Sequence, residues 1–316
     1  MLANDLNLHT IEWKQRVEHF DPETKEWKLL ATQEAGWSEA GAWYIKLEQA
    51  TENADGSPAG AVRVESGSRD GIVERTFLPD DSSGSIQPAE LNRWWLPSPL
   101  LALGRMVGAG RMARLGELLL ESPDLRITSR SPDGRYATIQ GTLLTGGSVV
   151  LAEVRVDSAQ SFVPTSWVLR DALSNIPIET VEVQEVSRIE GVVVPTRAVR
   201  HTYRIADSVD PAQMARLDDE VRARGVDPMR RDPTKAEVRE AYAAAVAKAF
   251  GAKGIPYSEV WHAQRLALVT DLKVNAPFPL ERCDTPFPGH ATWADLVRFQ
   301  NPRGEPIEDP DRRGHE

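Results

Sequence analysis

The chain has a single cysteine and no long apolar run, and these two absences exclude several classes of protein. Because Cys283 is the only cysteine among 316 residues, no intrachain disulfide can form. No stretch approaches the run of about 18 apolar residues that a transmembrane helix requires, so the chain is not expected to span a membrane. Residues 1–9 lack the charged and apolar regions of a signal peptide, and we expect either a cytoplasmic protein or an export signal outside this chain.

Positive charge is also scarce. The sequence has 37 Lys and Arg residues against 47 Asp and Glu residues, which gives a net charge of -10. An acidic surface repels phosphate, so nucleic acid is not expected as a partner. Hydrophobic residues make up 41% of the chain and charged residues 27%, values that are ordinary for a globular protein with a packed core.

The sequence also lacks a recognisable catalytic or metal-binding motif. It has no Gly-rich phosphate loop and no G-x-S-x-G elbow, and none of its six histidines stand in pairs at metal-ligand spacing. Cys283 has no constellation of His and Asn around it, which favours a small buried residue over a nucleophile. We therefore expect a non-enzyme without metal or cofactor. An enzyme would be favoured again if His201 or His262 lay within hydrogen-bond reach of an acidic residue at the mouth of a pocket.

Alternating apolar and polar residues predict β-strands over most of the chain. Within 10–17, the apolar residues Ile11, Trp13 and Val17 share one face and the charged residues share the other. An Asp-Gly pair at 70–71 between two alternating runs predicts a hairpin. Successive strands joined by tight turns predict an antiparallel meander. The predicted strands are 10–17, 26–32, 42–48, 61–65, 72–78, 125–129, 136–144, 149–156, 166–170, 177–186, 192–203 and 260–274, with loops at 49–60 and 79–88.

Two segments carry helical patterns instead. In 94–120 apolar residues recur at helical spacing, and several glycines predict two short helices with a break near 108–110. In 206–258 we expect one helix from Pro211 to Ala223, and a second between Asp232 as N-cap and Gly251 as C-terminal stop. The charged, Pro-containing segment 301–316 predicts a flexible tail. One domain, 1–205 with 259–300, would then carry the helical insertion 206–258.

Nine tryptophans are spread along the chain, and several lie in predicted strands beside aliphatic residues. Ordinary core packing is one interpretation, since tryptophan is mostly buried in folded proteins. The other is an aromatic-lined pocket under a curved sheet that receives acyl chains, with the apolar segment 94–120 covering it. The candidate ligand-binding residues are Trp13, Trp43, Trp94, Trp95, Leu100, Leu103, Met106 and Trp167.

Part of the sequence resembles a known family. Val154 to Asp157 reads Val-Arg-Val-Asp, and it is followed by Phe-Val-Pro at 162–164, a strand with Trp167, and a Gly-Val-Val-Val-Pro step at 191–195. The Asp-Gly turn at 70–71 and the segments 274–278 and 287–289 add to this likeness. Together they resemble the outer-membrane lipoprotein carrier (LolA-like) superfamily.

The resemblance implies an α+β fold: a curved antiparallel sheet, or open half-barrel, with helices on its concave face. It implies a non-catalytic, periplasmic or cell-envelope protein that holds a lipid, an acyl chain or a lipoprotein between sheet and helices, without a cofactor. The chain departs from the family pattern, because the N-terminal helix is missing and 206–258 is extra, and no position matches the carrier's cargo-handling arginine. The alternative is a structural or interaction protein of an envelope assembly, whose partner would bind an exposed apolar patch on 206–258.

Overall fold

A single large sheet dominates the computed structural model, which describes residues 7–52, 58–88, 96–108, 111–145, 148–227, 232–260 and 263–296. Fifteen strands form this sheet, in the order β17-β6-β5-β4-β3-β2-β1-β16-β14-β13-β12-β11-β10-β9, with β15 added on β14. All of its pairings are antiparallel except that of β17 with β6. The strands are β1 (Thr10–Asp21), β2 (Glu26–Ser38), β3 (Trp43–Glu52), β4 (Pro58–Ser68), β5 (Val73–Leu78), β6 (Ser83–Pro88), β9 (Arg126–Arg130), β10 (Tyr136–Thr145), β11 (Ser148–Asp157), β12 (Val163–Asp171), β13 (Pro177–Ile189), β14 (Val192–Ile205), β15 (Tyr257–Glu259), β16 (Gln264–Val274) and β17 (Thr292–Asp295).

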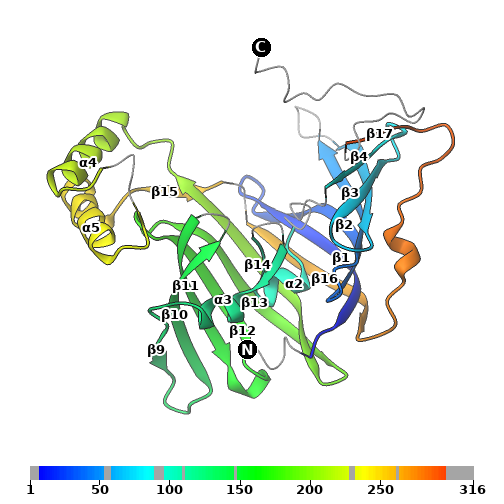
Figure 1. Ribbon diagram of the computed structural model, residues 1–316, viewed down its shortest axis with the longest axis horizontal. Helices are drawn as coiled ribbons and strands as arrows, with labels where there is room; N and C mark the ends of the chain where they lie inside the picture. The colour runs from blue at the N-terminus through cyan, green and yellow to red at the C-terminus, as the bar shows by residue number, and fades with distance from the viewer. Residues whose placement is uncertain are drawn as a thin grey trace.

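The sheet consists of two meanders that meet at a short junction. Strands β1 to β6 form one wing and strands β9 to β14 form the other, and each strand pairs with its neighbour in the sequence (Figure 1). The wings join through β16, which pairs with β1 over most of its length but with β14 at only three positions, 264–266 with 198–200. The predicted fold class, a large antiparallel sheet with few helices, is confirmed.

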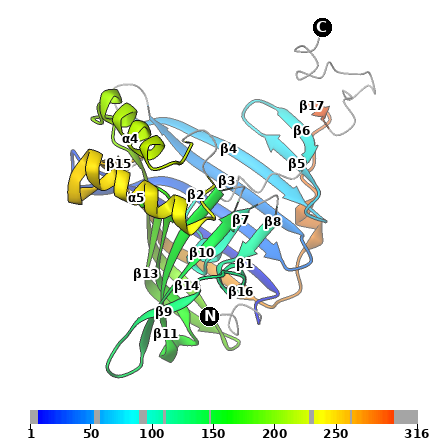
Figure 2. The same cartoon turned by 60° about the vertical axis from the view of Figure 1, so that its left-hand side comes forward.

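Two short helices and a hairpin lie on the concave face between the wings (Figures 1 and 2). Helix α2 (Pro99–Ala102) is followed by the hairpin of β7 (Arg105–Gly108) and β8 (Arg111–Arg114), and then by helix α3 (Leu115–Leu120). The two predicted helices are present but shorter than the pattern suggested, because the hairpin occupies the middle of the segment. Gly104, at φ 83°, makes the turn that ends α2 and sends the chain into β7. We call residues 96–120 the plug.

The helical insertion also forms. Helix α4 (Pro211–Ala223) begins as predicted after Asp210, whose side chain accepts a hydrogen bond from the Ala212 N–H at 2.8 Å. Helix α5 (Ala236–Phe250) starts later than predicted, because Asp232 caps a preceding turn through the Thr234 N–H and not the helix itself. Gly251 ends α5 as predicted. The two helices pack on each other to one side of the sheet (Figure 1).

The last described segment crosses the outer face of the first wing. Residues 276–291, here called the strap, include the 3-10 helix η4 (Leu280–Cys283) and end at β17 beside β6. The segment 79–88 is not the loop that the sequence predicted, because Ser83–Pro88 forms strand β6 and pairs with both β5 and β17. The predicted tail 301–316 lies outside the described residues.

Candidate binding site on the concave face

Three tryptophans of the first wing and two leucines of the plug form one buried cluster. Trp13 on β1, Trp37 on β2 and Trp43 on β3 point to the concave face, where Trp37 and Trp43 are cross-strand partners. Leu100 of α2 and Leu103 directly after it pack against them, together with Val192 to Val194 of β14. Side chains along a β-strand point alternately to its two faces. The position of each tryptophan in its strand places all three on the same side of the sheet. The cluster therefore fills the angle between the two wings.

Buried amide groups fasten the plug to this cluster. The Gln15 Nε2 group donates to the Pro97 carbonyl at 2.9 Å and to the Gln33 Oε1 atom at 2.5 Å, and the Trp13 Nε1 group donates to the Gln15 Oε1 atom at 2.8 Å. Ser98 then caps α2 by accepting from the Leu101 N–H at 3.1 Å. Because buried polar groups need partners, this chain of hydrogen bonds fixes where the plug enters the concave face.

A second cluster lies under α3 on the other wing. Trp167 of β12 packs there with Leu143 of β10 and with Leu115 and Leu119 of α3. The α3 helix sits close to β10 because Gly141 has no side chain, and a Cβ atom at that position would lie 2.7 Å from the Ser122 hydroxyl. The Trp167 indole N–H has no hydrogen-bond partner among the described residues, although the ring is buried. Such a donor is a polar point in an otherwise apolar surface.

A buried cation lies at the edge of the first cluster. The Arg105 guanidinium stacks 4.0 Å above the Trp37 ring and donates to the Leu8 carbonyl at 3.4 Å. Arg105 is the first residue of β7, and its side chain is 4% exposed. Stacking on an indole face compensates part of the cost of removing a guanidinium from water. The concave face thus combines an apolar floor with the buried guanidinium of Arg105.

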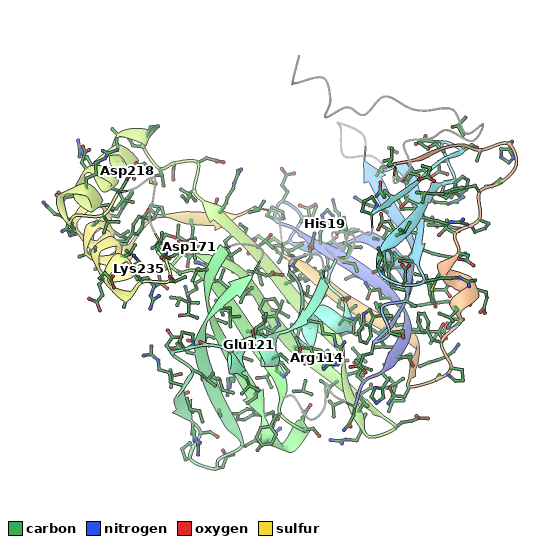
Figure 3. The ribbon with its side chains drawn as sticks, viewed as in Figure 1. His19, Arg114, Glu121, Asp171, Asp218 and Lys235 are labelled. Carbon is green, nitrogen blue, oxygen red and sulfur yellow. The ribbon has the colours of Figure 1, made fainter. Side chains whose placement is uncertain are left out.

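Ion pairs tie the far end of the plug to the first wing. The guanidinium of Arg114, which Figure 3 labels, pairs with Glu117 at 2.9 Å and with Glu39 in the turn between β2 and β3. His9 approaches the same Glu39 carboxylate at 2.8 Å. These groups hold the carboxylate in its charged form, so the pKa of Glu39 lies below its usual range.

The structure brings together part of the predicted site. Trp13, Trp43, Leu100 and Leu103 share the first cluster, and Trp167 lies in the second. Met106 belongs to β7 and not to a helix, and the direction of its side chain is not described. Trp94 and Trp95 lie outside the described residues. Sequence reasoning missed Trp37, Gln15, Gln33 and Arg105.

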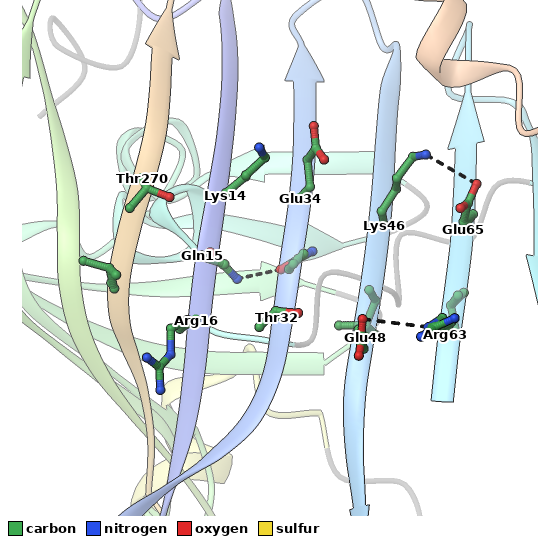
Figure 4. A pocket seen from close by; sticks show the side chains of 14 residues that line it. Lys14, Gln15, Arg16, Thr32, Glu34, Lys46, Glu48, Arg63, Glu65 and Thr270 are labelled. Carbon is green, nitrogen blue, oxygen red and sulfur yellow. Dashed lines mark hydrogen bonds and ion pairs between the residues drawn. The ribbon is translucent and has the colours of Figure 1, made fainter. Parts of the chain in front are cut away.

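The outer face of the first wing carries a groove of about 440 Å³. Two rows of side chains border it across β16, β1, β2, β3 and β4 (Figure 4). In one row Lys46 stands 3.6 Å from Glu65, and in the other Arg63 stands 3.8 Å from Glu48. These are solvated cross-strand ion pairs, each worth well under about 1 kcal/mol. Because both charge signs alternate along it, the groove supports no single ligand class.

One histidine meets half of the condition set for an enzyme. The His201 Nδ1 atom lies 2.6 Å from the Glu259 Oε1 atom, and the His201 ring stacks on Tyr203. Neither member of the pair lines the groove of about 440 Å³ or either of two smaller hollows, one beside β10 and β11 and one beside η4. His262 lies outside the described residues. The described part of the chain also holds no group of three potential metal ligands.

The apolar residues of the helix pair face inward. Leu217 and Val221 of α4 pack with Tyr242 and Val246 of α5 in a cluster that also takes in the turn between β12 and β13. Among the described residues of 206–258, Tyr257 is the one large hydrophobic side chain with high exposure. The exposed apolar patch expected on this insertion is therefore absent from its described part.

Comparisons with known proteins add similarity at the level of structure. No protein-family model and no curated protein matches the chain. Over 90% of its length the chain is similar to a domain assigned as an outer membrane lipoprotein-sorting protein from Vibrio parahaemolyticus, with 94% of that chain covered, 8% identity and a TM-score of 0.42. A LolA superfamily protein from Nitrosomonas europaea matches 65% of the chain and 84% of its own at 16% identity and a TM-score of 0.35. A DUF1329 family protein from Desulfovibrio piger matches 63% of the chain and 81% of its own at 9% identity and a TM-score of 0.30.

The printed descriptions of two of these structures name lipoprotein sorting and the LolA superfamily, which is the superfamily that the sequence resembles. These likenesses give no correspondence of residues. Within the described segments, no helix combines the length and the apolar content needed to cross a bilayer.

Proposed function

We propose that this protein is a non-catalytic binding protein that holds an apolar ligand, such as an acyl chain, on its concave face in place of the plug. The observation that carries the proposal is the make-up of the plug. Its helices have only four and six residues, yet the plug inserts Leu100, Leu103, Leu115 and Leu119 among the tryptophans of both wings. A helix shorter than about 12 residues is not stable by itself in water, so these helices persist through their contacts with the sheet.

The energies of the two occupants are comparable. Burying a leucine side chain contributes about 1.5–3 kcal/mol, and each methylene of a bound chain contributes about 0.8 kcal/mol. Four leucines and an acyl chain of roughly twelve methylenes therefore each amount to about 10 kcal/mol. An exchange between them is close to neutral, which is what reversible uptake and release require. The envelope location implied by the sequence resemblance belongs to the same proposal and is tested by cell fractionation.

Binding of a dansyl-labelled fatty acid tests the proposal, because two variants should change its affinity in opposite directions. Leu100→Ala removes apolar contact from the competing plug, so we expect the probe to bind more tightly, by about tenfold for every ~1.4 kcal/mol of plug packing that is lost. Trp43→Ala removes part of the floor, so we expect weaker binding. The measurement is saturable fluorescence enhancement by the dansyl group.

Leu217→Ala is the matched control, because it opens a buried site in the helix pair and leaves the concave face intact. It should lower stability without changing probe affinity. If the wild type and Leu100→Ala both fail to bind the probe saturably, the two tryptophan clusters are ordinary core and the proposal is wrong.

A further inference from the structure

The large sheet ends at β9, and this strand is an unusual edge. It pairs with β10 on one side, and no described strand lies on the other. All five of its residues are exposed. An edge strand presents unpaired backbone N–H and C=O groups, which makes it a template for a further strand.

Apolar side chains at this edge are left open to solvent. Ile139 of β10 packs against the second cluster, and its cross-strand partner Ile127 of β9 is 51% exposed. Two more aliphatic side chains open to solvent nearby in the chain, Leu120 at the end of α3 with 63% exposure and Leu125 just before β9 with 41%. A strand added to β9 would cover Ile127 and extend the row of apolar contacts by one position.

The charges at the edge select the occupant. Arg126 and Arg130 stand at the two ends of β9, although the whole chain has a net charge of -10. β9 pairs with β10 through Arg130–Ala137 and Arg126–Gln140 with Thr128 as an extra residue, so the two arginines lie on opposite faces of the sheet. A second copy of β9 on this edge would bring two further arginines to it, and like charges that approach each other repel. Carboxylates on an added strand would instead meet an arginine at each end.

We propose that β9 is a docking edge for an extended acidic segment of a partner protein, which adds to the sheet as a further strand. The segment has apolar side chains that cover Ile127 and carboxylates near both ends that pair with Arg126 and Arg130. Backbone hydrogen bonds supply affinity in this mode, and the alternating side chains supply specificity. This interaction is separate from ligand binding on the concave face.

The test uses the full protein and two fluorescein-labelled peptides with the core Glu-Thr-Val-Glu or Lys-Thr-Val-Lys, in which the two charged side chains point to opposite faces of the added strand, as Arg126 and Arg130 do on β9. Fluorescence anisotropy should show binding of the acidic peptide only, weakened by salt. Amide hydrogen exchange should slow at residues 126–130 when that peptide is bound. The double variant Arg126→Glu/Arg130→Glu should weaken binding by about tenfold or more, since each cross-strand charge pair is worth up to about 1 kcal/mol.

The double variant Arg188→Glu/Arg216→Glu is the matched control, with the same change of net charge at exposed positions away from the edge. It should bind the acidic peptide as the wild type does. Equal binding of both peptides, or binding without protection at 126–130, would overturn the proposal. Sedimentation of the protein alone is the remaining readout: a dimer that Ile127→Lys dissociates would mean that a second copy, and not an acidic partner, covers β9.

Discussion

Cys283 has a thiol whose surroundings oppose ionisation. It lies in the strap and is 2% exposed, and burial together with the neighbouring Asp284 raises its pKa to about 11. Since the thiolate is the reactive form, the native thiol should react with a disulfide reagent at pH 8 about two orders of magnitude more slowly than the unfolded chain. Absorbance after addition of the reagent, with and without denaturant, measures both rates. A native rate equal to the unfolded rate would show that the strap does not shield this thiol.

Some of the buried tryptophans could be predicted from the sequence, and others could not. Trp13 was placed on the apolar face of its strand correctly, because alternation along a strand is a local property. Trp37 was missed because β2 was predicted to end at residue 32, whereas it runs to Ser38. Arg105 could not be foreseen as a buried cation, since its stacking partner Trp37 lies 68 positions earlier in the chain.

At the scale of elements, the strap depends on glycines in three strands of the first wing. A Cβ atom added at Gly36 of β2 or at Gly84 of β6 would lie within 3.0 Å of Phe278 or Phe287 of the strap. At Gly67 of β4 it would lie 2.6 Å from the Cys283 carbonyl oxygen. These positions form a flat track on which the strap lies, and the side chains Phe278 and Phe287 also pack near Tyr44 and Phe77.

The substitution Gly67→Ala should displace the strap from the sheet. Its Cβ atom meets backbone atoms, which cannot rotate away, so we expect a loss of about 1–3 kcal/mol of stability and faster labelling of the Cys283 thiol. Gly289→Ala is the control, because no atom lies within 4 Å of the added Cβ and the expected change is within about 0.5 kcal/mol. Thiol labelling and chemical denaturation measure the two effects. If Gly67→Ala labels no faster than Gly289→Ala, the strap can shift without exposing the thiol.

Elements with a strong local signal were predicted well, and those that depend on distant partners were not. The Asp210-Pro211 start and Gly251 stop of the helix pair are carried by single residues whose chemistry favours those positions. Hairpin β7–β8 was read as helix because its apolar residues also fit helical spacing, and only the sheet beneath decides between the two. Strand β6 has the Gly- and Ser-rich composition of a loop, and it is a strand because β5 and β17 pair with it on both sides.

At the scale of the whole molecule, the core is divided into separate apolar clusters. Two of them lie on the concave face, and a third joins α4 and α5 to the turn between β12 and β13. The backbone pairing between the two wings is limited to three residue pairs of β14 and β16. The sheet therefore joins the clusters of the two wings only weakly. We expect such a molecule to open in parts, because each cluster is stabilised by its own contacts.

Two matched leucine variants test this division. Leu217 of α4 and Leu143 of β10 are both completely buried, one in the cluster of the helix pair and the other beneath α3. Replacing either by alanine should cost about 2–5 kcal/mol, the usual range for a cavity of this kind. In Leu217→Ala we expect faster amide hydrogen exchange in 210–250 while strands β10 to β13 stay protected, and in Leu143→Ala we expect the reverse. If both variants lose protection over the whole chain together, the helix pair is part of one cooperative core and the predicted insertion 206–258 is not an independent unit.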